Sequence, residues 1–238
     1  MTEVLAQLDE HGFCVVEDVL ARDETKSVAD RLERAYMTYD AGLVTGEAAN
    51  EDGISRPSEI SFAPNLARQD AAMAQFCRRP ELLLLAAQAL GPDVDFYWDQ
   101  LVFKAPETAK DFPWHQDDAY GRVDPSPYLT LWIALNDATA ENGCMWVLPG
   151  SHKRGFIPHR RGPEGLACHD NTHADQGVQV PVAAGSILVF WSLTVHKSGP
   201  NLSGDVRRAY IVQYTKAGTR DAATGKPVDA IPVLRSHA

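Results

Sequence analysis

The sequence predicts a mainly β protein in which helices buttress one face of a β-sandwich or open barrel. Helical periodicity is confined to roughly the first 92 of the 238 residues, and short strand-like runs follow from residue 94 to about residue 216. Helices first and many short strands later are typical of this class of fold. We therefore expect a single domain over residues 1–238, with a helical part over about 1–92 and a β core over about 94–216.

The N-terminal part contains three predicted helices. Residues 2–11, 22–39 and 79–90 carry apolar side chains at helical spacing, and the last of these segments is closed by a Gly-Pro pair. Residues 13–16 form a short apolar run that we expect to be a buried strand. The segment 40–68 is rich in Gly, Asn, Ser and Pro, and it is predicted to be a mobile loop.

Seven strand-like runs make up the predicted β core. They are rich in β-branched and aromatic residues and cover 96–98, 101–103, 129–135, 145–148, 178–182, 186–191 and 208–214. Turn signals of the Asn-Gly, Pro-Gly, Ala-Gly and Ser-Gly type separate several of them. Between residues 151 and 176 lies a long polar insertion with four histidines and few strand signals. Loops of this length are often lids or binding loops.

The overall charge and the cysteines exclude several classes of function. A formal net charge of −10 argues against a nucleic-acid partner, and it favours a cationic or neutral small substrate over an anionic one. No apolar run is long enough to cross a membrane, and the first residues lack the features of a secretory signal, so we expect a cytoplasmic protein with no membrane partner. Four widely spaced cysteines favour buried free thiols over structural zinc or disulfides. The oligomeric state is not indicated.

The run Pro113-Trp-His-Gln-Asp-Asp-Ala-Tyr120 is the sharpest local feature. It places His115 and Asp117 two positions apart, so on an extended strand their side chains point to the same face. His196 follows the strand predicted at 186–191 and supplies a third ligand. Two histidines and one carboxylate form the facial triad of non-haem iron(II) oxygenases, which leaves coordination positions open for a 2-oxo acid and dioxygen. The His-x-Asp pair alone is a weak signal, because such pairs also arise by chance.

The surroundings of this pair resemble the phytanoyl-CoA dioxygenase family of iron(II)- and 2-oxoglutarate-dependent oxygenases. The resemblance includes the His-x-Ser-x-x-Asn run that begins at His196, the Arg-x-Ala strand start at Arg207, and the block Asn142-Gly-Cys-Met-Trp-Val-Leu-Pro-Gly-Ser-His152. It extends to the opening Leu8-Asp-Glu-His-Gly-Phe13 and so covers nearly the whole chain in the right order. The joint occurrence of these motifs makes a chance match very unlikely.

The resemblance implies a double-stranded β-helix (a jelly-roll, cupin-like core) with the metal site at one mouth. His115, Asp117 and His196 match the iron ligands of the family, and Arg207 matches the arginine that binds 2-oxoglutarate. The planar fork of an arginine suits bidentate pairing with a carboxylate. The alternative is that Arg207 is a surface ion-pair residue. Its neighbour Arg208 faces the opposite side of the strand and fits that description better, unless the register is shifted by one.

Four further residues are candidate contacts of the co-substrate. The resemblance matches Lys104 to a lysine that helps to bind 2-oxoglutarate in some members, Ser198 to a hydroxyl near it, and Trp132 to a tryptophan that lines its pocket. Gln100 has the same strand parity as Lys104 and could reach the same site. The alternatives are core packing for Trp132 and a solvated strand end for Lys104.

The carboxylate at Asp117 bears on the type of reaction, because related halogenases carry Gly or Ala in its place. Halogenation is therefore disfavoured. Hydroxylation of a C–H bond stays open, as do desaturation, oxidative cyclisation and epimerisation. We expect an oxidoreductase of the dioxygenase class, with iron(II), 2-oxoglutarate and dioxygen as its cofactors and co-substrates. The alternatives are a cupin-like metal protein that needs no oxo acid, and a binding protein that has no catalytic activity.

The substrate is the least constrained part of the prediction. Asp111, Asp118, Tyr120 and Asp124 surround the metal motif and suit an amine-bearing or polyhydroxylated metabolite, although ordinary solvated loop charge explains them as well. No basic cluster offers a grip for the phosphates of coenzyme A. Members of the family commonly tailor secondary metabolites. An amino sugar or similar polar compound, in antibiotic biosynthesis, is therefore our leading expectation.

Overall fold

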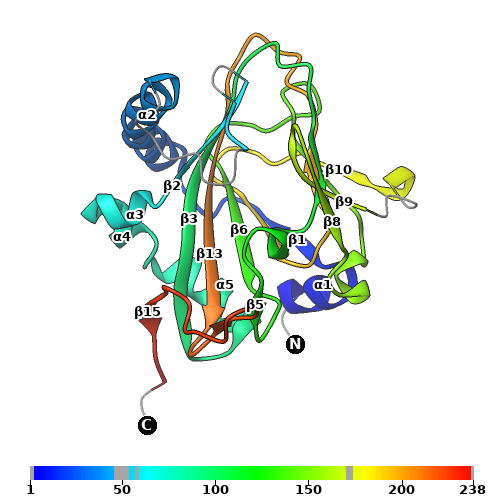
Figure 1. Ribbon diagram of the computed structural model, residues 1–238. Helices are drawn as coiled ribbons and strands as arrows, with labels where there is room; N and C mark the ends of the chain where they lie inside the picture. Colours follow the sequence, from blue (N-terminus) through cyan, green and yellow to red (C-terminus); the bar gives the residue numbers. More distant parts are fainter. Residues whose placement is uncertain (1–2, 46–53, 57–58, 170–173, 237–238) are drawn as a thin grey trace.

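The larger of two facing sheets carries most of the strands. The computed structural model describes residues 3–45, 54–56, 59–169 and 174–236. Within this part of the chain, the sheet has the strand order β1–β11–β6–β13–β3–β15, and β2 pairs with β3 beside β15 (Figure 1). The bounds of these strands are β1 Phe13–Val16, β11 Ile187–Trp191, β6 Leu129–Ala134, β13 Arg207–Lys216, β3 Val94–Lys104, β15 Ile231–Leu234 and β2 Ile60–Pro64.

The smaller sheet faces the first sheet across an apolar interior. Its strand order is β10–β7–β12–β4, with bounds Val178–Val180, Met145–Val147, His196–Ser198 and Phe112–His115. Two short antiparallel pairs lie outside it, β5 (Val123–Asp124) with β14 (Arg220–Asp221) and β8 (His159–Gly162) with β9 (Gly165–Cys168). Short 3₁₀ helices cover Asp117–Ala119, Ser151–Arg154 and Ala174–Gln176. The predicted mainly β jelly-roll fold is confirmed.

Strand β13 shows why the larger sheet separates two apolar clusters. Tyr210 and Val212 point outward and join the cluster under the helices, whereas Ala209 and Ile211 point inward to the cluster between the sheets. Strand β6 alternates in the same way. Successive side chains of a strand face opposite sides. A strand that is buried on both faces therefore reads as an almost continuous apolar run, which is what the sequence has at these positions.

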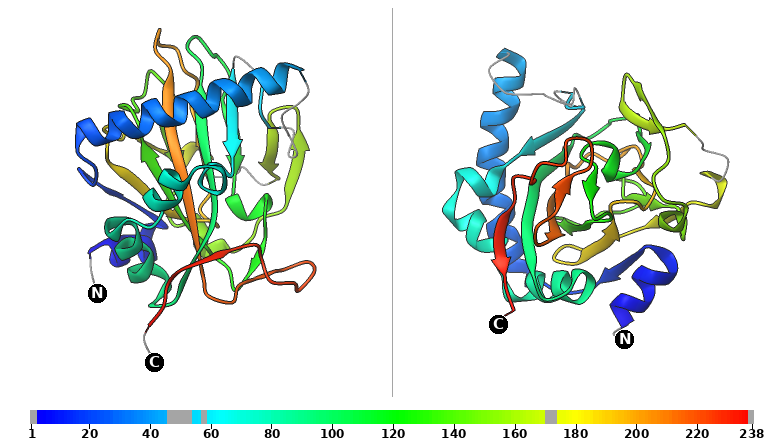
Figure 2. Two further views of the ribbon diagram at one scale, coloured as in Figure 1. Left: turned by 90° about the vertical axis from the view of Figure 1, so that its left-hand side faces the viewer. Right: turned by 60° about the horizontal axis from the view of Figure 1, so that its bottom comes forward.

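The helices cover the outer face of the larger sheet. Their bounds are α1 Glu3–His11, α2 Arg22–Thr45, α3 Leu66–Gln69, α4 Ala71–Phe76 and α5 Pro80–Leu90. The left view of Figure 2 shows the long α2 crossing the strands of this sheet. Tyr36 of α2 stacks on Phe103 of β3, with ring centroids 3.8 Å apart and planes at 9°. The helices therefore close one side of the sheet, and the other side is left for the site.

The prediction of a mobile loop over residues 40–68 is wrong for the part that the structure describes. Helix α2 continues to Thr45, and β2 and α3 occupy Ile60–Pro64 and Leu66–Gln69. Strand β2 is held by pairing with residues 100–104 of β3, and its Phe62 is buried between the sheets. A strand of this length depends on its neighbours more than on its own composition, so it gave little periodic signal. Residues 46–53 and 57–58 lie outside the described residues.

Two other predictions of local structure need correction. The runs 96–98 and 101–103 are parts of the single strand β3. The polar pair Asp99 and Gln100 between them suggested a break, but the Asp99 carboxylate is buried and accepts hydrogen bonds from the Tyr210 hydroxyl and the Ala67 amide. The insertion at 151–176, expected to have few strands, contains the β8–β9 hairpin. Its β8 residues are mostly exposed and charged, and they lack the alternation that marks a buried strand.

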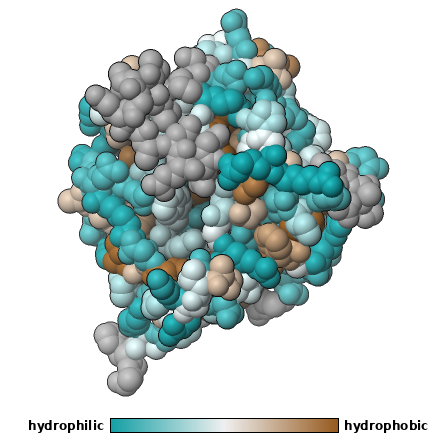
Figure 3. Space-filling model, in the orientation of Figure 1, coloured by the Kyte–Doolittle hydropathy of each residue, from teal (hydrophilic) through white to brown (hydrophobic). Residues whose placement is uncertain are grey.

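The surface is mostly polar, as expected for the composition. Figure 3 shows one face of the molecule, on which apolar side chains form small separate patches. Within the described residues, no helix is both long and apolar enough to cross a membrane. The four cysteines are buried thiols outside any disulfide, as predicted.

Candidate active site

Three ligand-type side chains meet at one end of the smaller sheet. His115 ends β4, Asp117 begins the 3₁₀ helix that follows, and His196 begins β12. Strands β4 and β12 pair so that His196 stands opposite His115. One oxygen of Asp117, Oδ1, lies 3.4 Å from Nε2 of His196 and 3.7 Å from Nε2 of His115. The ligand atoms of this triad all lie within 4.8 Å of one another, a spacing that fits a single metal ion.

The backbone holds both imidazoles in the form that binds metals. Nδ1 of His115 lies 2.8 Å from the Pro113 carbonyl, and Nδ1 of His196 lies 2.8 Å from the Thr194 carbonyl. A carbonyl oxygen can only accept, so each Nδ1 carries the proton and each Nε2 lone pair is directed to the site. Burial, and then the neighbouring His196, lower the pKa of His115 to about 3, so its ring is neutral at physiological pH.

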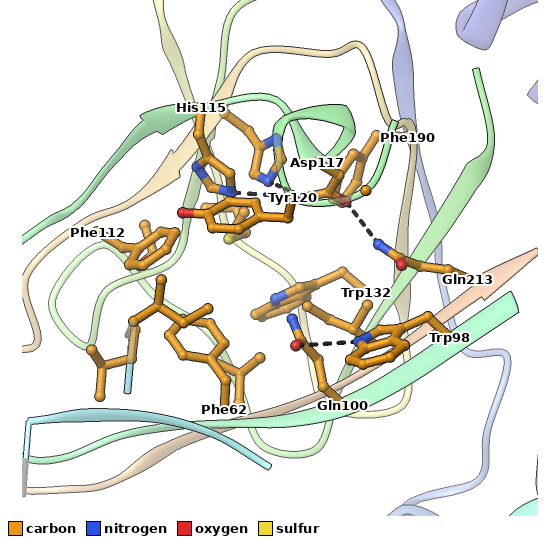
Figure 4. A pocket seen from close by; sticks show the side chains of 18 of the residues that line it. Phe62, Trp98, Gln100, Phe112, His115, Asp117, Tyr120, Trp132, Phe190 and Gln213 are labelled. Atoms are coloured by element: carbon orange, nitrogen blue, oxygen red, sulfur yellow. Dashed lines mark hydrogen bonds and ion pairs between the residues drawn. The ribbon is translucent and has the colours of Figure 1, made fainter. Parts of the chain in front are cut away.

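The carboxylate of Asp117 presents one oxygen to the site and has the other one occupied. Oδ2 accepts hydrogen bonds from the Thr130 hydroxyl at 2.7 Å and from the Gln213 amide at 3.0 Å (Figure 4). Burial raises the pKa of Asp117, but the two histidines and the Thr130 hydrogen bond outweigh it, so the net shift is downward. Asp117 is therefore an anion with Oδ1 left for a metal.

Arg207 is a buried cation with unused donors. Its side chain is 1% exposed, and its guanidinium lies over the ring of Trp132, 5.3 Å from the centroid. Within the described part of the chain, Nε and Nη1 of Arg207 have no hydrogen-bond partner. Burial lowers its pKa to about 10, which leaves it charged at neutral pH. Buried charges and donors are normally paired, so this arrangement fits an anion with two acceptor atoms.

Lys104 and Ser198 lie close to Arg207. Arg207 is the register partner of Lys104 across β13 and β3, and Lys104 Nζ donates to the Ser198 hydroxyl at 3.3 Å and to the Gly199 carbonyl. Burial, and then the charge of Arg207, lower the pKa of Lys104 to about 7. Arg208 faces the helices instead, where it pairs with Glu33 at 3.0 Å. The two arginines thus lie on opposite faces of the sheet.

A cavity of about 310 Å³ joins the triad to Arg207. Trp132 and Ser198 line its wall near Arg207, and Gln100 lies across the cavity from the triad beside Trp98, whose indole donates to it at 3.5 Å (Figure 4). The sequence-predicted site residues other than Lys104 all line this cavity, and Lys104 is buried directly behind it.

The residues expected at the mouth lie elsewhere, except Tyr120. Asp118 is 1% exposed and accepts a hydrogen bond from Ser126, and Asp111 pairs with Lys197. Asp124 is exposed on β5. None of the three acidic residues lines the cavity.

The histidines of the insertion also lie away from the cavity lining. Nε2 of His159 accepts from the Gln116 amide at 3.0 Å, which ties the β8–β9 hairpin to the metal motif. His169 contacts Arg160, and His173 lies outside the described residues.

Sequence reasoning missed Thr130 and Gln213, which orient the carboxylate. A signal for both was present in the strand parity. Gln213 has the parity of Arg207 on β13, and Thr130 has the parity of Trp132 on β6. A polar residue at an inward position of an otherwise apolar strand requires a partner.

Comparisons with known proteins agree on the family and the fold. A family model described as phytanoyl-CoA dioxygenase matches residues 8–209. The curated "Phytanoyl-CoA dioxygenase" of Arabidopsis thaliana is 35% identical over 218 residues, which cover 88% of this chain and 76% of that protein. The matched region spans only about half the length of several other curated relatives.

Two solved structures share the architecture over almost the whole chain. The apo non-haem monooxygenase ThoJ is 22% identical with a TM-score of 0.78, covering 99% of this chain and 85% of its own. The epimerase SnoN was solved in complex with Fe³⁺, alpha ketoglutarate and nogalamycin RO. It is 19% identical with a TM-score of 0.70, and the match covers 98% of this chain and 94% of SnoN. At these identities the likeness establishes the fold.

Proposed function

The chain belongs to the phytanoyl-CoA dioxygenase family, and we propose that its triad holds the iron of an iron(II)- and 2-oxoglutarate-dependent oxygenase. It is a dioxygenase of this class, which uses iron and takes 2-oxoglutarate and dioxygen as co-substrates. The residue roles that we assign are His115, Asp117 and His196 as metal ligands and Arg207 as the main anchor of 2-oxoglutarate.

The observation that carries these assignments is the orphaned guanidinium of Arg207 in the same cavity as the triad. Two of its donors are buried and unpaired among the described residues, and bidentate pairing with a carboxylate would satisfy both. The triad independently offers two imidazole nitrogens and one anionic oxygen, a donor set that suits iron(II). The residues present therefore fit both groups.

Each residue contributes positioning or charge. When bound, iron and 2-oxoglutarate supply the oxidising chemistry that activates a C–H bond. Lys104 and Ser198 lie where they can support the carboxylate held by Arg207, and Trp132 covers the guanidinium on one face. Thr130 and Gln213 keep Asp117 turned so that one oxygen faces the metal.

We further propose that the substrate is a small metabolite and that the reaction is hydroxylation, or oxidative cyclisation or desaturation, in the tailoring of a secondary metabolite. The intact Asp117 carboxylate supports oxygenation over halogenation. The epimerase SnoN was solved with nogalamycin RO bound, which supports a role of this kind for a protein of the same fold. An amino-sugar product remains our proposal for the pathway.

The direct test is anaerobic addition of iron(II) and 2-oxoglutarate to the purified protein. We expect a visible metal-to-ligand charge-transfer band that needs both additions and that is lost in Arg207→Met. A metal that binds with no band and no effect of the oxo acid would favour the alternative, a cupin-like metal protein that is independent of 2-oxoglutarate. Failure of the protein to bind iron would contradict the assignment of the triad.

A further inference from the structure

The strand register divides the cavity into two ends. Lys104 of β3 stands opposite Arg207 of β13 at one end. Six positions along β13, Gln213 stands between Trp98 of β3 and Thr130 of β6 at the other end. The inward row at Arg207 carries positive charge, and the inward row at Gln213 carries none. Because the proposed function assigns the charged end to 2-oxoglutarate, the second end is left for the substrate.

The second end has aromatic walls. Trp98, Tyr97 and Tyr128 lie at this end of the cavity lining, and the rings of Tyr97 and Tyr128 pack edge to face with centroids 5.2 Å apart. Burial raises the pKa of Tyr97 to about 12 and that of Tyr128 well above 10, so both phenols stay neutral. Flat walls of this kind complement a ring.

Among the described residues that line the cavity, the charged side chain that reaches this end is Asp117, whose Oδ2 accepts from the Gln213 amide and whose Oδ1 faces the metal site. Among the described residues that line the cavity, the only side chains with charge-bearing groups are the triad and Arg207. Of the acidic residues around the metal motif, Asp118 is buried and accepts a hydrogen bond from Ser126, Asp111 pairs with Lys197, and Asp124 is exposed on β5; none of the three lines the cavity. In the part of the chain that the structure describes, the acidic side chains that contribute to the net charge of −10 do not line the cavity, apart from Asp117.

Iron(II), Asp117, 2-oxoglutarate and Arg207 would together carry no net charge in the occupied centre. An iron(II) ion and Arg207 together carry three positive charges, and Asp117 and 2-oxoglutarate together carry three negative charges. Lys104, whose pKa of about 7 in the free protein a bound dianion would raise, lies at the far end beside Arg207. A charged group on the substrate would therefore lose its hydration without gaining a partner, which is unfavourable.

Two side-chain amides supply the polar contacts of the second end. Gln100 accepts from the Trp98 indole, and Gln213 donates to Asp117 and Thr130 (Figure 4). Amides discriminate hydroxyl and carbonyl groups by direction and carry no charge. Gln100 lies in the row between the two ends, with its amide against Trp98.

We propose that this end of the cavity selects an uncharged, ring-shaped group of the substrate, held between aromatic walls and oriented by Gln100. The inference rests on the proposed function and replaces a cationic group at the reacting end with a neutral one. A sugar or other ring with only hydroxyl groups remains compatible with it. An ammonium or carboxylate on the part that enters the cavity does not.

The test uses three probes of similar shape and different charge: naphthalene-2-methanol, naphthalen-2-ylmethylammonium and 2-naphthoate. Each is titrated calorimetrically, without oxygen, into protein that holds iron(II) and 2-oxoglutarate. We expect the alcohol to bind at least about tenfold more tightly than either ion. Tighter or equal binding of an ion, or no binding of the alcohol, would overturn the proposal.

Substitutions then locate the selection. Gln100→Glu places a carboxylate in the cavity. It should raise the affinity for the ammonium probe, relative to the affinity for the alcohol, by about tenfold or more. The matched control is Gln179→Glu on the exposed face of β10, which should leave the ratio unchanged. Trp98→Ala should weaken binding of the alcohol probe, whereas Leu84→Ala on the outer surface should leave its binding unchanged. An unchanged ratio in Gln100→Glu, in a variant that still folds, would contradict the assigned place of binding.

The charge-transfer band keeps this inference separate from the proposed function. If the band appears and the alcohol does not bind preferentially, the substrate end is wrongly assigned and the proposed function stands. If the band is absent, the proposed function fails, and the same probes titrated into protein without metal still report on the charge preference of the cavity.

Discussion

Replacing Arg207 by methionine should weaken 2-oxoglutarate binding strongly while leaving the free protein stable. Methionine retains most of the apolar stem and removes the guanidinium, whose Nε and Nη1 are buried and unpaired among the described residues. Loss of one partner of a buried, hydrogen-bonded charge pair costs about 2–5 kcal/mol. At about 1.4 kcal/mol per factor of ten, the dissociation constant should rise by about 30-fold to a few thousand-fold.

The free energy of unfolding of the free protein should behave differently. Each unsatisfied buried donor costs about 1–3 kcal/mol, whereas the cation–π contact with Trp132 that is lost contributes about 0.5–2 kcal/mol. Arg207→Met should therefore be about as stable as the parent, or more stable, when no ligand is present. A substitution that merely damaged the fold would lower both quantities.

Arg208→Met is the matched control. Arg208 pairs with Glu33 at the surface, with side chains 26% and 41% exposed, so its loss should cost at most about 1 kcal/mol of stability and should not affect the oxo acid. The assay is the growth of the charge-transfer band as 2-oxoglutarate is added anaerobically with iron(II), together with denaturant unfolding of the free proteins. Equal effects of the two substitutions, or a larger effect at Arg208, would refute the assigned roles.

Four further outcomes are expected. Alanine at each position of the triad should abolish iron binding or turnover in a metal titration, and full activity of any variant would remove that residue from the metal site. Thr130→Val should lower the affinity for iron by about 10–100-fold, because it removes the hydrogen bond to Oδ2 of Asp117. Thr130→Ser keeps a hydroxyl and should retain the affinity of the parent protein. Equal iron affinities of the two variants would contradict the role of the hydroxyl. The pKa of Lys104 is about 7 in the free protein, and a bound dianion raises it, so binding of 2-oxoglutarate takes up a proton. The affinity for 2-oxoglutarate should therefore be highest below pH 7 and fall by up to about tenfold per pH unit above it. Lys104→Met should flatten this profile, and an affinity that rises with pH would contradict the prediction. Tyr120→Phe should speed hydrogen exchange at the Leu166 amide, which donates to the Tyr120 hydroxyl at 3.0 Å, by about fivefold, with no change in iron binding; an unaltered exchange rate would mean that the hairpin is held by other contacts.

The fold was predictable wherever burial imposed a pattern on the sequence. The runs that became β6, β11 and β13 are apolar on both faces, so they were found with nearly correct ends. Strands β2 and β8 were missed because their stability comes from pairing with a neighbour, which no local window of sequence contains. Strand β3 was split because the buried Asp99 resembles a turn residue until its partners are known.

The site also has a part that could be predicted from the sequence and a part that could not. The spacing of His115, Asp117 and His196 and the family resemblance indicated the triad, and the structure brings the three side chains together. Thr130 and Gln213, which both bind Asp117, are 83 positions apart in the chain. They come together only because of the register in which β6 and β13 pair. The acidic residues around the metal motif were misleading, because sequence proximity to the motif did not determine which way Asp118 or Asp111 turned.

The alternation along β13 has a consequence for how this protein can change over time. Tyr210, Val212 and Tyr214 secure the helices, while Ile211 and Gln213, on the opposite side of the same strand, face the ligand cavity. Replacements at Ile211 should alter the cavity wall without disturbing the contacts of the first set. Substrate preference can therefore change during evolution with little change in the free energy of unfolding. Laboratory selection would be most productive at the apolar inward positions Val102 and Ile211, which line the cavity and have no assigned role in holding the metal or 2-oxoglutarate.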